Sequence, residues 1–157
     1  MARLQGISVN LNALLDTIGF SEGTTTIAES DDGYNVEVGG TLFQGYADHP
    51  RKLVTLNKAG LQSTAAGRYQ ILAKFFDYYK KALDLPDFSP ESQDKIAIQM
   101  MKEVHALDLI EAGNFQKAVI QCGSRWASLP NNSYGQRQVP IADLQAAYEK
   151  AGGTVVV

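Results

Sequence analysis

Cysteine, histidine and long apolar runs are scarce in this chain, and each scarcity excludes a class of structure. Cys122 is the only cysteine among 157 residues, so an intrachain disulfide is impossible. The two histidines, His49 and His105, stand in no recognisable catalytic or ligand context, which argues against a Cys–His nucleophile and a metal site. No stretch has the apolar length of a signal peptide or a membrane span, so we expect a soluble chain made in the cytoplasm.

The chain also lacks a large excess of charge of either sign, because the net charge is −3 and the sequence pI is about 5.3. Such a balance draws a protein neither to nucleic acid nor to an anionic membrane, and the short basic clusters at 49–52 and Lys80–Lys81 are interpreted as solvated surface. No Walker or Rossmann glycine loop is present, so no cofactor is expected. Cys122 shares an apolar stripe with Phe115 and Val119, which favours a buried packing role.

The length fits one domain spanning residues 1–157, and apolar spacing predicts that helices dominate it. The predicted helices are one that ends at Gly23, one along Leu72–Leu83, one begun by Ser89 and Pro90, a short one at 106–112, one from Asn114 through Cys122, and one opened by Pro140 and ended by Gly152–Gly153. On the second of these, Leu72, Phe75, Phe76, Tyr79 and Leu83 are expected to face the core.

One region breaks the helical pattern and alternates instead. "YNVEV" has period two, Gly39–Gly40 offers a turn, and "TLF" returns as a partner strand. We therefore expect a small hairpin or three-stranded sheet there, followed by an irregular loop to about residue 62. The predicted fold class is a mostly helical α+β domain with a small N-terminal antiparallel sheet, ending in a "TVVV" tail that frays.

Glu22 occupies an unusual position in "GFSEGTTT", the last turn of the first predicted helix. The helix dipole disfavours an anion there by about 0.3–1 kcal/mol, although position alone is weak evidence for catalysis. Polar stretches recur in "GYNVEV", "STAAGRYQ" and "SLPNNSYGQ". Their glycine, tyrosine, amide and hydroxyl groups suit a carbohydrate better than a nucleotide or a lipid.

The motifs "SEGT", "GYNVEVGG", "DHPRKLVTLN", "STAAGRYQ", "WASLP", "YGQ" and "AGGT" occur in this order. Together, over about residues 10 to 155, they resemble the phage lambda endolysin family of lytic transglycosylases. The resemblance implies a lysozyme-like fold and a substrate made of peptidoglycan glycan strands. It makes Glu22 the acid that cleaves the bond from N-acetylmuramic acid to N-acetylglucosamine. The same residue then acts as the base that forms a 1,6-anhydro ring without water.

The resemblance also implies the substrate contacts. They are Asn35, Ser63, Tyr69, Gln70, Tyr134 and Gln136, where amide and hydroxyl groups bind N-acetyl groups and tyrosine rings stack on sugars. For Tyr69 a place in the core is an equal alternative. Trp126 is expected to pack under the cleft.

Two positions depart from the family pattern. Asn35 stands where the lambda member carries an aspartate, which counts against a hydrolase with two carboxylates. Phe75–Phe76 replaces two tryptophans. Substitutes for the second carboxylate would be Glu29, Asp32, Glu37 or Asp48. The alternatives are therefore a hydrolytic muramidase of the same fold and a peptidoglycan-binding module without catalysis.

A general acid that works near neutral pH needs a pKa above the usual glutamate value of about 4.3. The helix dipole supplies less than one pKa unit, so we expect Glu22 to be partly buried against apolar or aromatic groups. The sequence has no obvious coiled-coil pattern or exposed apolar face, so we expect a monomer. The resemblance further implies that the chain accumulates in the host cytoplasm and reaches the cell wall through a holin-like pore, without inserting into the membrane itself.

Overall fold

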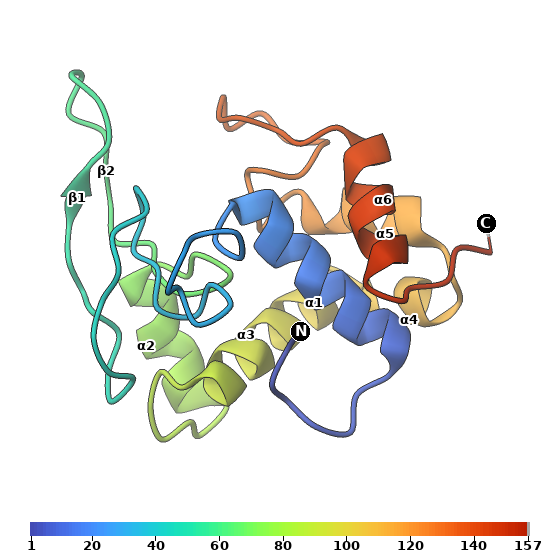
Figure 1. The fold of residues 1–157 in the computed structure, drawn as a ribbon, viewed down its shortest axis with the longest axis horizontal. Coiled ribbons are helices and arrows are strands. Elements are labelled where there is room, and N and C mark those ends of the chain that lie inside the picture. The colour runs from blue at the N-terminus through green and yellow to red at the C-terminus, as the bar shows by residue number, and fades with distance from the viewer. Residues whose placement is uncertain (157) are drawn as a thin grey trace.

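The computed structural model describes residues 1–156. In them the chain forms α1 (Val9–Glu22), β1 (Val54–Thr55), β2 (Gln62–Ser63), α2 (Ala73–Ala82), α3 (Pro90–Glu103), α4 (Leu107–Glu111), α5 (Phe115–Cys122) and α6 (Ile141–Lys150). Helix α1 crosses the middle of the molecule, with α4, α5 and α6 on one side and the β-hairpin and α2 on the other (Figure 1). The predicted α+β class with a small antiparallel sheet is confirmed.

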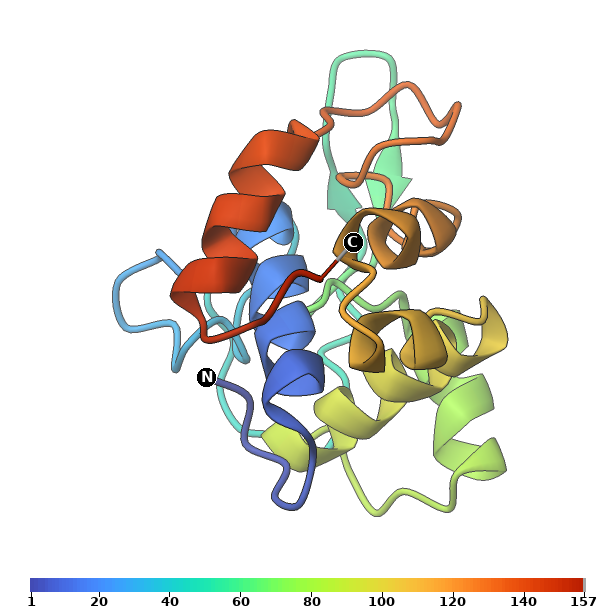
Figure 2. The same ribbon diagram turned by 90° about the vertical axis from the view of Figure 1, so that its right-hand side faces the viewer.

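Helix α1 has a capping residue at each end, which explains its bounds. The Ser8 hydroxyl accepts the Leu11 backbone N–H at 3.0 Å, so it satisfies a donor in the first turn. Gly23 ends the helix with φ 76°, a left-handed conformation that glycine adopts without a Cβ penalty, as predicted. Between them α1 packs against α6, α4 and α3 (Figure 2). It is thus the central helix and carries Glu22 at its end.

The remaining helices begin close to their predicted positions. The Ser89 side chain accepts the Ser92 N–H, Pro90 occupies the first turn of α3, and α6 starts directly after Pro140. The core face predicted for α2 is partly wrong. Phe76 is fully buried, but Phe75 is 41 % exposed because it faces the cleft described below.

The regular strands lie where the sequence predicts a loop. β1 and β2 pair antiparallel, with Val54 opposite Ser63. Gly60 closes the turn between them with φ 88°, and its N–H donates to the Asn57 carbonyl at 3.2 Å. The predicted location of the sheet, at residues 33–43, is therefore wrong, and the Asn57 and Gly60 turn residues are the local signal that would have corrected it.

The 33–43 segment does reverse direction at Gly39–Gly40, where both glycines have positive φ. Only isolated bridges form there, one of them between Val36 and Leu42. The other edge of this segment is used by a different part of the chain, since the Val38 N–H donates to the Ala65 carbonyl at 2.9 Å. Pairing is thus shared between two short partners instead of extending along one.

The C-terminal tail is held against the body over its described length. The Val156 N–H donates to the Gly113 carbonyl at 2.9 Å, in contrast to the expected fraying, and Val157 lies outside the described residues. None of the helices in residues 1–156 combines the length and apolarity that crossing a membrane requires.

A buried carboxylate joins the N-terminal segment to α3. Asp94 has no exposed surface and accepts four hydrogen bonds. The donors are the backbone N–H groups of Arg3 at 2.8 Å and Leu4 at 2.9 Å, and the hydroxyls of Tyr34 at 2.8 Å and Tyr69 at 2.5 Å. All of the acceptor capacity of this charge is met inside the protein, as a buried carboxylate requires.

A buried cation lies next to it. Arg68 is 1 % exposed, and its Nη2 lies 2.6 Å from Asp16 Oδ1 on α1. Its Nε donates to the Asp32 carbonyl at 3.0 Å, and its backbone N–H donates to Gln93 Oε1 on α3 at 2.9 Å. Its own carbonyl accepts the Thr24 hydroxyl at 2.7 Å. One residue thereby connects α1, α3 and the loop that follows α1.

Replacing Asp94 by alanine is expected to lower the free energy of unfolding by at least about 3 kcal/mol, because two buried hydroxyls and two partly buried backbone N–H groups lose their acceptor. Chemical denaturation followed by circular dichroism measures this. Lys95→Ala, at the next and exposed position of α3, is the matched control and is expected to change stability by less than about 0.5 kcal/mol. Equal effects of the two substitutions would contradict the role given to Asp94.

Candidate active site

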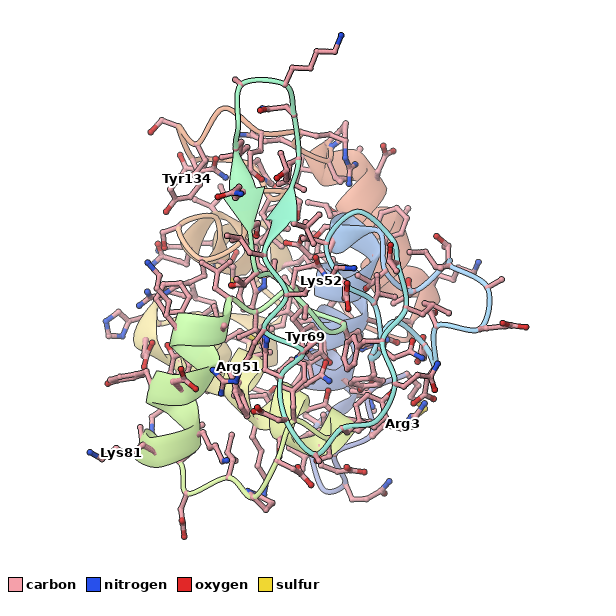
Figure 3. All side chains as sticks on the ribbon, turned by 90° about the vertical axis from the view of Figure 1, so that its left-hand side faces the viewer. Arg3, Arg51, Lys52, Tyr69, Lys81 and Tyr134 are labelled. Atoms are coloured by element: carbon pink, nitrogen blue, oxygen red, sulfur yellow. The ribbon has the colours of Figure 1, made fainter. Side chains whose placement is uncertain are left out.

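A cleft of about 550 Å³ is lined by the hairpin on one part of its surface and by the 124–136 segment on another. The hairpin contributes Leu56, Leu61, Gln62 and Ser63; α2 and α3 contribute Phe75, Tyr79 and Met100; the 124–136 segment contributes Ser124, Arg125, Trp126, Ala127, Tyr134 and Gln136. In Figure 3 Tyr134 lies at the periphery near the hairpin. The volume is in the range of cavities that bind small organic ligands.

The lining combines aromatic rings with neutral hydrogen-bonding groups. Phe75 and Tyr134 present accessible rings, being 41 % and 57 % exposed, and Gln62, Gln70 and Gln136 supply amides. Such a surface matches a pyranose, whose faces are apolar and whose edge carries hydroxyl and N-acetyl groups. Among the lining residues within 1–156, two have ionisable side chains of acidic or basic type, Glu22 and Arg125.

Glu22 enters the cleft from the last turn of α1 and is half-buried. The Ser128 hydroxyl lies 3.1 Å from Glu22 Oε1 and 2.9 Å from the Ser21 hydroxyl. Ser21 donates its own proton to the Ile18 carbonyl, so the single proton of Ser128 is shared between the Ser21 oxygen and the Glu22 carboxylate. Ser128 is held in turn by the Val139 N–H, which donates to its carbonyl at 2.7 Å.

The surroundings of Glu22 raise the pKa of its carboxyl from 4.5 to about 7. Burial is the largest cause, because a desolvated carboxylate is disfavoured relative to the neutral acid. The hydrogen bond from Ser128 and the positive charge of Arg137 act in the opposite direction. Arg137 is close because its Nη2 donates to the Ser21 carbonyl at 2.9 Å, at the end of α1. A group with a pKa near 7 can give and take a proton at neutral pH.

The structure brings most of the predicted contact residues to one surface. Ser63, Gln70, Tyr134 and Gln136 all line the cleft together with Glu22. Gln70 is fixed by its Nε2, which donates to the carbonyls of Val36 at 3.1 Å and Gly67 at 2.8 Å, so its side-chain oxygen is left for a ligand.

Two predicted contact residues are not in the lining. Tyr69 is fully buried and its hydroxyl donates to Asp94, so its ring has no face available for stacking on a sugar, and the core interpretation holds (Figure 3). Asn35 also lies outside the lining, and its Nδ2 makes a long contact of 3.5 Å with the Glu29 carbonyl. Trp126 is 3 % exposed and donates its Nε1–H to the Tyr69 carbonyl at 3.0 Å. It therefore packs at the base of the cleft.

Known proteins match this chain over nearly its whole length. The model of the Endolysin family matches residues 12–155. The endolysin of Escherichia phage lambda is 50 % identical over 145 residues, covering 91 % of each chain. That of Escherichia phage P2 is 44 % identical over 154 residues, covering 92 % of this chain and 93 % of its own.

The chain belongs to the endolysin family. Its fold is that of bacteriophage lambda lysozyme, whose structure in complex with a chitohexasaccharide superposes with a TM-score of 0.94 at 47 % identity and covers 98 % of this chain and 100 % of its own. A second structure of lambda lysozyme gives a TM-score of 0.89 at 46 % identity, with the same coverage. The predicted family and fold are confirmed.

Sequence reasoning missed several residues that line the endolysin cleft or contact the end of α1 beside it. Ser128 and Arg137 lie more than one hundred positions from Glu22 in the chain, and only the fold brings them together. "WASLP" contains Ser128, so that motif was the available signal. Leu56 and Leu61 were missed because the hairpin that presents them was expected to be a loop.

The raised pKa predicts how stability of this endolysin changes with pH. Below about pH 4 Glu22 is protonated in both the folded and the unfolded chain, so Glu22→Gln changes little. The pKa of Glu22 is 4.5 in the unfolded chain and about 7 in the folded one. As the pH rises between these two values, the wild type loses stability, because the unfolded chain releases the proton while the folded chain retains it. At pH 8 the Gln variant is expected to be more stable by up to about 3 kcal/mol. Denaturation at both pH values measures the difference, and a constant gap would contradict it.

Removing the Ser128 hydroxyl tests the second contribution to the pKa. Ser128→Ala takes away a donor to the ionised carboxylate, so the pKa of Glu22 is expected to rise further, by about half a unit to one unit. NMR titration of a carboxyl-labelled glutamate reports this directly, with Glu22→Gln identifying the resonance. Ser124→Ala is the control within the same cleft, and in this variant the pKa of Glu22 is expected to stay unchanged.

Proposed function

We propose that this endolysin cleaves the glycan strands of bacterial peptidoglycan as a lytic transglycosylase, with Glu22 as the acid and then the base. The observation that carries the proposal is the count of carboxylates in the cleft: of the residues that line it within 1–156, Glu22 alone is acidic. Hydrolysis by either standard route uses a second carboxylate, as a nucleophile or to activate water. A reaction in which the substrate supplies the nucleophile needs only one.

Protonated Glu22 gives its proton to the glycosidic oxygen while the bond from that oxygen to C1 of N-acetylmuramic acid breaks. The resulting carboxylate then takes the proton of the C6 hydroxyl of the same sugar as the C6 oxygen bonds to C1. The products are a new glycan end and a 1,6-anhydro ring, and Glu22 is protonated again. No water enters the balance, and ring closure gains from being intramolecular.

The pKa of about 7 supports both halves of this cycle, since neither protonation state of Glu22 is costly to reach near neutrality. The rest of the lining supports the substrate class. Ser63, Gln70, Tyr134 and Gln136 offer hydroxyl, amide and aromatic groups to the sugars, in keeping with the oligosaccharide bound by lambda lysozyme. On this proposal the enzyme reaches the wall through a holin-like pore.

The carboxylates considered as substitutes lie outside the lining, which weighs against a hydrolytic muramidase. Asp32 accepts Arg68 and the terminal ammonium, with Met1 N at 2.6 Å. Asp48 pairs with Arg51 at 2.9 Å. Glu37 is 7 % exposed, with the Lys52 ammonium 3.7 Å away, and Glu29 is exposed.

Mass spectrometry of muropeptides released from purified peptidoglycan tests the proposal. Wild type is expected to release products one water lighter than reducing-end muropeptides. Glu22→Gln is expected to release them about 10²–10⁴ times more slowly with an unchanged circular dichroism spectrum. Reducing ends would establish a muramidase instead, and no release by folded wild type would indicate a binding module.

A further inference from the structure

Arg125 is the only basic residue among the described residues that line the cleft, and the acid–base cycle of Glu22 makes no use of it. It precedes Trp126, whose ring nitrogen is bonded to the Tyr69 carbonyl, so its backbone is anchored at the base of the site. A cation in a cleft whose other groups suit neutral sugars calls for a separate explanation.

The guanidinium of Arg125 is held in place without using up its donors. Its Nη2 lies 3.4 Å from Glu103 Oε1, and the side chain is 38 % exposed. That Oε1 already accepts the Tyr79 hydroxyl at 2.6 Å. Charge-assisted N–H···O bonds are typically about 2.7–2.9 Å long, so the contact with Glu103 orients Arg125 more than it satisfies it. A guanidinium carries five N–H donors, of which this contact uses one.

Tyr79 fixes the place of this group within the cleft. Its ring lines the cleft, and its hydroxyl shares the Glu103 oxygen with Arg125. Glu103 is steadied from its other side by Gln99, whose Nε2 lies 3.4 Å from Oε2. Arg125 therefore lines the cleft next to Tyr79 and is held by Glu103 of α3, a contact that leaves its other N–H groups for a ligand.

We propose that Arg125 binds a carboxylate carried by the muramic acid residue of the substrate and so selects muramic-acid-containing strands over uncharged N-acetylglucosamine polymers. This inference rests on the proposed function. The glycan backbone itself has no charge. In stem-bearing strands the lactyl carboxyl of muramic acid is an amide to the first residue of the stem, so the carboxylates belong to the stem; in strands without a stem the lactyl group carries the carboxylate itself.

The shape of the guanidinium suits this ligand, because its planar fork binds both oxygens of a carboxylate in parallel. The net charge of the whole chain does not attract a carboxylate. At a net charge of −3 the protein is not attracted to an anionic wall, so attraction has to be local. A purely structural ion pair explains the arrangement less well, because the stronger bond to Glu103 Oε1 comes from Tyr79.

The experiment compares three ligands that differ in their carboxylates: glycan fragments with intact peptide stems, the same fragments after amidase treatment, which leaves the lactyl carboxylate, and chitohexaose, which has none. Binding is measured in a Glu22→Gln background, so that it is read independently of turnover, and KM and kcat are measured with catalytic Glu22. The variants are Arg125→Gln and Arg125→Lys. Lys102→Gln is the control, since Lys102 is exposed on α3 and outside the lining.

Arg125→Gln is expected to raise Kd and KM for stem-bearing fragments about tenfold, with kcat within about twofold and with chitohexaose binding unchanged. Arg125→Lys keeps the charge but loses the planar fork of the guanidinium, so its Kd and KM are expected to fall between those of the Arg125 and Arg125→Gln proteins. The difference in Kd between the Arg125 and Arg125→Gln proteins should shrink as the salt concentration rises. Loss confined to stem-bearing fragments would identify a carboxylate of the stem, and loss confined to amidase-treated glycan would identify the lactyl carboxylate. Loss with both would mean that the guanidinium binds whichever carboxylate the muramic acid residue carries.

A Kd that Arg125→Gln leaves unchanged for both stem-bearing and amidase-treated fragments would overturn the inference. An equal loss of chitohexaose binding would also overturn it, because such a loss marks a structural role. These outcomes are separate from failure of the proposed function. If folded wild type releases no anhydro product, the transglycosylase proposal fails, while the comparison of bound ligands still decides whether Arg125 reads a carboxylate.

Discussion

The arrangement of the cleft depends on a buried guanidinium, that of Arg68. Removing a charge from water costs several kcal/mol unless it is paired and hydrogen-bonded, so the partners of Arg68 have to be in place whenever the chain is folded. These partners come from α1, from the loop after α1 and, through Gln93, from α3. Since α1 ends in Glu22, and Gln70, Ile71 and Leu72 line the cleft shortly after Arg68, the charge fixes the Glu22 carboxyl relative to that part of the lining.

The next two residues have different surroundings, one in the core and the other in the cleft. Tyr69 turns inward to Asp94, while Gln70 lines the cleft with φ 53°. A left-handed residue reverses the local chain direction, so adjacent side chains reach opposite environments. Gln70 accepts this strained conformation because its N–H donates to the Gly67 carbonyl at 3.2 Å, and its side-chain Nε2 donates to that same carbonyl and to the Val36 carbonyl. Structural and ligand-facing groups are thereby placed side by side.

The sequence predicts most helix bounds well because the information is local. Ser89, Pro140 and Gly23 act on the backbone next to them, and apolar stripes report the buried face directly. The sheet was misplaced because its strands are two residues each and depend on pairing across a turn more than on composition.

The residues of the site also differ in whether local sequence predicts them. Glu22 follows from the helix end and from family resemblance, and its need for burial follows from the chemistry. Its partner Ser128 and the interior place of Tyr69 depend on contacts across the fold, which no local pattern encodes. The same holds for the cation at Arg125, whose neighbours Tyr79 and Glu103 come from two other helices.

Cys122 has a consequence for how the protein tolerates its surroundings. The thiol is fully buried, and burial raises its pKa to about 12, so thiolate, the form that attacks disulfides, is nearly absent at neutral pH. With no second cysteine in the chain, no internal bond can form. The covalent structure is therefore the same in a reducing compartment and in an oxidising one, and a molecule folded in the first needs no redox chemistry to keep its shape in the second.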